Sequence, residues 1–222
     1  MSEFIRLTAA DGHELDAYVA QPAGTPIAGL VVVQEIFGIN DHIRRVADGY
    51  AADGFYVVAP AIFDRVQRNV ELGYEGDDRT KAIGLMQQLD REKIQLDVAA
   101  AVEQAKSVAG NTGVIGYCLG GTQAWLSASR LPVQAAVGYY GGGIGQVATI
   151  PIHAPVILHF GLKDAHIGAD QRDAVHAAHP EVPIYTYDAD HGFNCDARAS
   201  YDATSAALAR ERSLAFLKEK LA

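Results

Sequence analysis

The sequence predicts an α/β fold: a mostly parallel central sheet with helices on both faces and an antiparallel hairpin at its start. Apolar segments of strand length alternate with segments of helix length along nearly the whole chain. Some of the apolar segments, such as GLVVVQ (29–34), are continuous β-branched runs typical of strands buried on both faces. The 222 residues suffice for one sizeable core, so we expect a single domain over 1–222.

The first half of the chain contains the hairpin and a strand–helix–strand unit. EFIRLT and HELDAYVA have strand composition, and Asp11-Gly12 between them favours a tight turn. A helix over 41–54, capped by Asn40 and ended by Gly54, is predicted between the strands GLVVVQ and FYVVAP. Residues 61–79 are polar and have no clear period, whereas 80–109 are predicted to be helical.

The second half continues the alternation of strands and helices. The predicted strands are TGVIGY (112–117), VQAAVGYY (133–140), PVILHFG (155–161) and PIYTYD (183–188). The predicted helices are TQAWLSASR (122–130), GADQRDAVHAAH (168–179) and a C-terminal segment from about Ser200 to Leu221. This order implies parallel strand pairing, because a helical crossover joins parallel neighbours.

Charge and composition exclude several classes of partner. The net charge is −9 and the basic residues do not cluster, which argues against nucleic acid. The chain shows no signal-peptide pattern and no run of about 18 apolar residues, so we expect no membrane association and a cytoplasmic location. The two cysteines, Cys118 and Cys195, form no CxxC motif, which favours free thiols in a reducing compartment.

Cys118 lies at the carboxyl end of a predicted strand, the edge where open α/β sheets bind ligands. Gly116-Tyr117-Cys118-Leu119-Gly120 is the cysteine form of the nucleophile elbow, whose glycines are needed because side chains there would collide with neighbouring elements. The alternative is a structural cysteine packed in the core. A dinucleotide-binding loop does not fit, because Cys118 stands where G-x-G-x-x-G requires a glycine.

A hydrolase of this architecture carries its nucleophile, acid and histidine in that order, each after a strand. Asp164 and His191 follow the next predicted strands in this order, so Cys118, Asp164 and His191 form a candidate triad. The backbone N–H groups of Ile36 and Leu119 are the candidates for an oxyanion hole, because the residue after the nucleophile and an early loop normally supply it.

Three other side chains each have one functional and one structural interpretation. Glu35, just past the strand 29–34, could hydrogen-bond the thiol and keep it protonated, or it could be solvated. Tyr139 and its neighbour Tyr140 could line a substrate pocket, or they could pack in the core as strand aromatics usually do. His176 and His179 are three residues apart without a third ligand, so we predict no metal site.

At these residues the chain resembles the dienelactone hydrolase (carboxymethylenebutenolidase) family of α/β-hydrolases. The matching segments are QEIFG (34–38), GYCLGG (116–121), AVGYYG (136–141), the pair KD (163–164), HGF (191–193) and ALARERSLAFL (207–217). The resemblance implies an α/β-hydrolase fold, with Cys118 as nucleophile and His191 as base. It also implies Asp164 as the residue that orients His191 and Glu35 as the carboxylate that partners the resting thiol.

Two arginines hold the substrate carboxylate in that family, and this chain matches one of the positions clearly. Arg79 falls at the first position. The second should lie four residues past the histidine, where this chain has Cys195, and the nearest arginine is Arg198. Arg79 and Arg198 are therefore the candidate substrate-binding arginines, and the departure at Cys195 leaves the natural substrate open.

The predicted activity is hydrolysis of a small ester or enol lactone through the triad, with no cofactor. The alternatives are a general thiol carboxylesterase, a thiol redox protein in which Cys195 resolves oxidised Cys118, and a non-catalytic binding module. The expected partner is a small ester or lactone, and this substrate carries a carboxylate if the candidate arginines bind it. We expect a monomer or a weak homo-oligomer.

Overall fold

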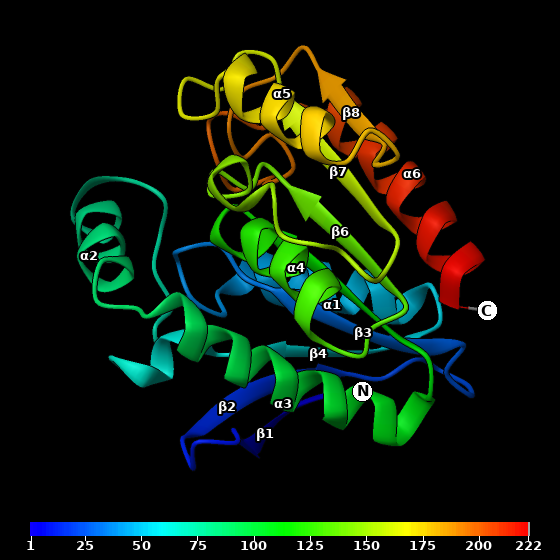
Figure 1. The fold of residues 1–222 in the computed structure, drawn as a ribbon. Helices are drawn as coiled ribbons and strands as arrows, with labels where there is room; N and C mark the ends of the chain where they lie inside the picture. Colours follow the sequence, from blue (N-terminus) through cyan, green and yellow to red (C-terminus); the bar gives the residue numbers. More distant parts are fainter. Residues whose placement is uncertain (222) are drawn as a thin grey trace.

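The computed structural model describes residues 1–221 and contains an eight-stranded sheet with helices on both faces (Figure 1). The strands are β1 (Ser2–Thr8), β2 (Glu14–Ala20), β3 (Ala28–Val33), β4 (Phe55–Pro60), β5 (Thr112–Tyr117), β6 (Ala135–Tyr139), β7 (Val156–Gly161) and β8 (Ile184–Tyr187). The helices are α1 (Asp41–Ala52), α2 (Gly76–Met86), α3 (Arg91–Ala109), α4 (Leu119–Arg130), α5 (Ala169–Ala178) and α6 (Ala203–Leu221), with short 3-10 turns η1 (Ile62–Arg65) and η2 (Gly145–Val147).

The sheet has the strand order β1-β2-β4-β3-β5-β6-β7-β8. β1 pairs antiparallel with β2, and β2 pairs antiparallel with β4, whereas the strands from β4 to β8 are parallel neighbours. Gly12 has a φ of 82°, which glycine adopts readily and which closes the β1–β2 turn. The predicted fold class is confirmed, including the hairpin at the start of the chain.

Two layers of helices enclose the parallel strands (Figure 1). Helices α3 and α4 pack on one face, over β3 to β6, and α1 and α6 pack on the other. All six residues of β3 are buried, as are all six of β5, because each of these strands has helices on both sides. The continuous apolar runs in the sequence are therefore explained by burial on two faces.

The predicted helix over 80–109 is wrong in its extent, because the structure has two helices there. Helix α2 begins at Gly76, inside the segment that showed no period, and α3 begins at Arg91. Asp90 caps α3, since its side chain accepts the backbone N–H groups of Glu92 and Lys93. Helix α2 lies away from the sheet (Figure 1) and packs by Ala82 and Leu85 into a separate small apolar cluster. The apolar residues of α2 show only weak helical periodicity in the sequence, because just one narrow stripe of this helix is buried.

The turn between β5 and α4 is tighter than the sequence predicts. Helix α4 begins at Leu119, three residues before the predicted start, and Cys118 has a φ of 56°, in the left-handed region. A Cβ at Gly116 would overlap the carbonyl oxygen of Gly120, and a Cβ at Gly120 would overlap that of Val33. Both glycines are therefore required for α4 to approach β3 and β5 this closely.

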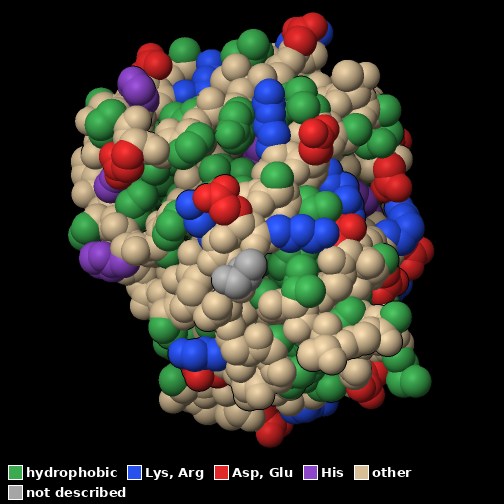
Figure 2. Space-filling view, turned by 90° about the vertical axis from the view of Figure 1, so that its right-hand side faces the viewer, with side chains coloured by type: hydrophobic (Ala, Val, Ile, Leu, Met, Phe, Trp, Pro, Cys, Tyr) green, Lys and Arg blue, Asp and Glu red, His purple; other side chains and the backbone are tan. Residues whose placement is uncertain are grey.

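The surface around the C-terminus carries basic and acidic side chains that are interspersed (Figure 2). No helix within residues 1–221 combines the length and the apolar character that a bilayer crossing requires.

Replacement of Gly120 by alanine should lower the free energy of unfolding by about 2 kcal/mol or more, because the new Cβ overlaps backbone that cannot move independently. Gly84→Ala is the matched control: it lies within α2 and its added Cβ would meet no atom within 4 Å. That substitution should raise the free energy of unfolding by about 0.5–1 kcal/mol. Urea denaturation of both variants measures the difference, and equal stabilities would contradict the packing argument.

Candidate active site

Cys118, His191 and Asp164 meet at the carboxyl edge of the parallel strands. Cys118 follows β5, Asp164 follows β7 and His191 follows β8. The Nε2 atom of His191 lies 3.2 Å from the Cys118 Sγ, and its Nδ1 atom lies 2.7 Å from the Asp164 Oδ2. The three residues are 27 and 73 positions apart along the chain, so only the parallel sheet brings them together.

The histidine is shielded from solvent and flanked by a carboxylate. The Asp164 side chain is fully buried, and that of His191 is 11% exposed. Burial by itself raises the pKa of Asp164, but the hydrogen bonds and charges of His191 and His166 together outweigh it and the net shift is downward. Burial likewise opposes protonation of His191, yet the hydrogen bonds to Asp164 and Cys118 raise its pKa to about 10. The site therefore favours an imidazolium between a carboxylate and a sulfur.

Residues around the histidine fix its position. The second carboxylate oxygen of Asp164, Oδ1, accepts the backbone N–H of His166 at 2.8 Å. The ring of Tyr140 lies 5.1 Å from that of His191, and Tyr140 has a φ of 36°. Tyr140, which the sequence offers as a possible pocket residue, therefore lies beside the histidine, and its strained backbone, which marks such sites, is not visible in a sequence.

A cavity of about 430 Å³ opens above Cys118 and His191. Ile36 and Leu119 line it, so both candidate oxyanion-hole residues border the same space as the sulfur. Sequence reasoning missed several other lining residues as candidates: Phe37, which lies in the segment QEIFG, and Ile83, Met86, Arg91, Thr122, Gly142, Gly143, Gln146 and His166, for which no motif gives a signal.

Arg79 and Arg198 also line this cavity, but their surroundings differ. Arg79 is exposed on α2, and within residues 1–221 no acidic side chain lies at ion-pair distance from it. Arg198 is largely buried and donates from Nη1 to Oε1 of Glu35 at 3.2 Å. Of these two guanidinium groups, that of Arg79 is therefore free and that of Arg198 is paired.

Glu35 differs from both interpretations of the sequence. It is 1% exposed, so the solvated alternative is wrong. Its hydrogen-bond partner is Arg198, whereas the sulfur of Cys118 faces His191. The carboxylate therefore pairs with the buried guanidinium and not with the thiol in this structure, because opposite charges attract more strongly than a carboxylate and a neutral thiol.

Tyr139 does not line the cavity, which corrects its expected role in substrate binding. The side chain is fully buried, and its hydroxyl lies 2.8 Å from the Ser213 hydroxyl of α6. Its ring packs 4.5 Å from that of His159. Successive side chains of a strand point to opposite faces, so Tyr139 is directed to the α6 side of the sheet while Cys118 lies at its edge.

The second cysteine is placed poorly for redox chemistry. Cys195 is fully buried and both cysteines are free thiols. Burial and the negative charge of Glu35 raise the pKa of Cys195 to about 12. A resolving cysteine needs an accessible thiolate, so these surroundings disfavour the redox alternative.

Comparison with known proteins identifies relatives that span nearly the whole chain. The model of the dienelactone hydrolase family matches residues 15–221. Carboxymethylenebutenolidase of Pseudomonas putida is 34% identical over 227 residues, which cover 98% of this chain and 96% of that protein. Carboxymethylenebutenolidase 1 of Cupriavidus pinatubonensis is 29% identical over 98% of this chain and 97% of its own length.

Solved structures agree with these relatives. A crystal structure from Klebsiella pneumoniae, described as a dienelactone hydrolase, superposes with a TM-score of 0.84 at 30% identity and covers 97% of this chain and 98% of that one. The family match, the relatives and the shared fold together show that this chain belongs to the dienelactone hydrolase family and is a carboxylic ester hydrolase.

Proposed function

We propose that this hydrolase cleaves small esters or enol lactones with Cys118 as nucleophile, His191 as base and Asp164 as the residue that orients His191. One observation carries the proposal: a continuous line of contacts runs from Asp164 Oδ2 through His191 to Cys118 Sγ, at 2.7 and 3.2 Å. A nucleophile within reach of a base that a third group orients is the arrangement expected for covalent catalysis.

In the proposed reaction the Cys118 thiolate attacks the carbonyl carbon, a C–S bond forms and the carbonyl electron pair moves to oxygen. As the tetrahedral intermediate collapses, the leaving alkoxide takes a proton from the His191 imidazolium. His191 then removes a proton from water, which attacks the acyl carbon and displaces the Cys118 sulfur. Asp164 stabilises each imidazolium state by its hydrogen bond to Nδ1.

The N-terminus of α4 supports the charge that develops on the carbonyl oxygen. Leu119 is the first residue of α4 and borders the cavity together with Ile36. The backbone N–H groups of these two residues form the proposed oxyanion hole, and the positive end of the helix dipole adds to their effect.

The cationic cavity favours substrates that carry a carboxylate. Arg79 lies at the mouth of the cavity without an acidic partner, so it is free to bind an anion. Arg198 already donates one N–H to Glu35, so its charge is partly neutralised before a substrate binds. We therefore assign the first contact with the carboxylate to Arg79 and a secondary role to Arg198.

The proposal extends to the organisation and location of the protein. One continuous apolar core includes residues from Leu7 to Leu221, which supports a single hydrolase domain over 1–222. Two free thiols, one of them the nucleophile, favour a reducing compartment such as the cytoplasm.

Turnover of a panel of small lactones and esters, each with and without a carboxylate, tests the proposed reaction and the substrate class together. We expect saturable hydrolysis, with lower KM values for the carboxylate-bearing members. Saturable turnover of the neutral members alone would contradict the substrate class, and no turnover of any member would contradict the reaction.

Iodoacetamide should abolish hydrolysis of p-nitrophenyl acetate by alkylating Cys118, which borders the cavity and contacts His191. Cys195 is the internal control: it is fully buried, and burial raises its pKa to about 12, so it should react far more slowly. Peptide mass spectrometry assigns the modified thiol. Complete inactivation with unmodified Cys118 would exclude it as the nucleophile.

His191→Gln should lower kcat/KM about 100-fold or more, because no general base remains beside Cys118. His176→Ala, an exposed histidine on α5, is the matched control and should leave kcat/KM within about twofold of that of the natural chain. An equal loss in both variants would show a general effect of histidine removal.

The same His191→Gln variant has a defined pH signature in stability. The pKa of His191 is raised from 6.5 to about 10 in the folded state, so its contribution to stability is fully present below 6.5. The contribution is lost as the pH rises through about 10. Denaturant unfolding across this pH range should therefore show the gap between the natural chain and the variant narrowing, and a constant gap would contradict the assigned ionisation.

Arg79→Ala should raise KM for an anionic ester roughly three- to tenfold more than for its neutral methyl ester, because only the anionic substrate loses a charge-assisted bond. Lys81→Ala is the matched control, since Lys81 is an exposed cation on the same helix that does not line the cavity. Equal effects on the two esters would show that Arg79 is not an anion ligand.

A further inference from the structure

Three side chains with metal-ligating atoms lie together beneath the loop that follows His191, outside the proposed triad. They are Glu35, just after β3, His42 in the first turn of α1, and Cys195. One carboxylate oxygen, one imidazole nitrogen and the sulfur all lie within 4.8 Å of one another. The residues are 1%, 4% and 0% exposed, respectively.

Two polar atoms of these side chains have no hydrogen-bond partner within residues 1–221. They are Oε2 of Glu35 and Nε2 of His42, and both are buried. A buried polar atom without a partner is costly, and folded proteins rarely leave one. Two of them in one cluster indicate that a further group belongs between them.

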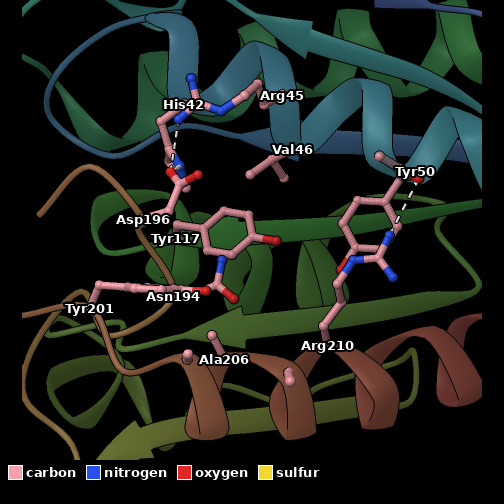
Figure 3. Close-up of a pocket in the computed structure, with 13 residues that line it drawn as sticks. His42, Arg45, Val46, Tyr50, Tyr117, Asn194, Asp196, Tyr201, Ala206 and Arg210 are labelled. Atoms are coloured by element: carbon pink, nitrogen blue, oxygen red, sulfur yellow. Dashed lines mark hydrogen bonds and ion pairs between the residues drawn. The ribbon is translucent and has the colours of Figure 1, made fainter.

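The other polar atoms of the same side chains are already bound, which orients the free ones. Nδ1 of His42 lies 2.9 Å from Oδ1 of Asp196 (Figure 3). A carboxylate there favours the tautomer with a proton on Nδ1, so Nε2 offers its lone pair. Oε1 of Glu35 accepts from Arg198 at 3.2 Å, which leaves Oε2 for the cluster.

The contact of Asp196 with His42 also suits a metal ligand. Outer contacts of this kind orient metal ligands in proteins and increase their affinity.

We infer that Glu35, His42 and Cys195 form a binding site for a divalent zinc ion, separate from the triad. A thiolate, an imidazole and a carboxylate are the donors that zinc prefers, whereas magnesium and calcium require oxygen donors. Zinc–ligand bonds of about 2.0–2.3 Å place tetrahedral ligands roughly 3.3–3.8 Å apart. The present spread of up to 4.8 Å therefore closes with small side-chain movements, and water takes the fourth position.

Binding releases one proton and adds one net positive charge to the site. The Cys195 thiol gives its proton to solvent and its sulfur bonds to zinc, while Glu35 binds as a carboxylate and His42 as a neutral ring. The two positive charges of zinc meet the new thiolate, and the Asp196 carboxylate lies behind His42.

Two cavities that do not include Cys118 border His42, one member of the cluster. His42 borders a cavity of about 320 Å³ between α1 and α6, in which it lies beside Arg45 and Asp196 (Figure 3). It also borders a second cavity of about 380 Å³ next to the loop 71–74. Neither cavity is lined by Cys118 or His191.

Cobalt, which takes zinc sites and reports thiolate ligation by a near-ultraviolet charge-transfer band, tests the site directly in the full chain. One equivalent of Co²⁺ should produce the band, and Zn²⁺ should remove it. Cys195→Ser and His42→Gln should each abolish the band. Cys118→Ser is the matched control, because it removes the other thiol and should leave the band unchanged.

Two outcomes would overturn the proposal. One is that the natural chain gives no band and retains no zinc after gel filtration, which does not depend on any variant folding. The other is that Cys118→Ser abolishes the band while Cys195→Ser keeps it, which would place the metal at the nucleophile. Neither outcome bears on ester hydrolysis, so the triad proposal stands or fails by its own tests.

The contact between Asp196 and His42 allows a separate test of the zinc site. Asp196→Asn should weaken zinc binding about ten- to hundredfold in competition with a chromophoric chelator, because His42 loses its orienting carboxylate. Asp188→Asn is the control, since Asp188 is an exposed acid paired with Lys163 elsewhere on the surface. Equal zinc affinities in the two variants would contradict the assigned role of His42.

Discussion

The close approach of backbone at the β5–α4 turn is the constraint on which the site depends. Gly116 and Gly120 have no room for a Cβ, because the carbonyl oxygens of Gly120 and Val33 already occupy that space. The packing forces Cys118 into the left-handed region, with a φ of 56°, and directs its sulfur out of the turn. The strain is stored at one residue and is held by the surrounding sheet and helices. As a result, the Cys118 thiol lies at the N-terminal end of α4 and faces the cavity.

The parallel sheet then supplies the partners of that sulfur. Loops after β7 and β8 emerge at the same edge as β5, so Asp164 and His191 converge on Cys118 without any contact in sequence. Burial of the aspartate makes its hydrogen bond to His191 strong enough to hold the ring protonated against the cost of desolvation. The positions of these three side chains and the protonation of His191 therefore both depend on how the neighbouring strands pair.

Cys195 and Arg198 both lie close to the buried carboxylate of Glu35. Glu35 is fully buried, and its charge is compensated by Arg198 from the loop after His191. The Glu35 carboxylate therefore has two sets of neighbours. It pairs with Arg198, which lines the cavity, and it belongs to the buried cluster with His42 and Cys195. Cys195 supplies a sulfur ligand close to the free atoms of Glu35 and His42, which is why the zinc site is inferred for this chain.

Local patterns in the sequence determined the strands, most helices and the fold class, because burial on both faces demands continuous apolar runs and sharp turns demand glycine. The order of Cys118, Asp164 and His191 also indicated a triad, whose catalytic role the experiments above test. Tertiary structure alone decided the break before Asp90, the burial of Tyr139, and the pairing of Glu35 with Arg198, 163 residues away. It alone brought His42 to Cys195. These contacts join segments that have no periodic relation in the chain, and each is fixed by which loops the folded sheet places side by side.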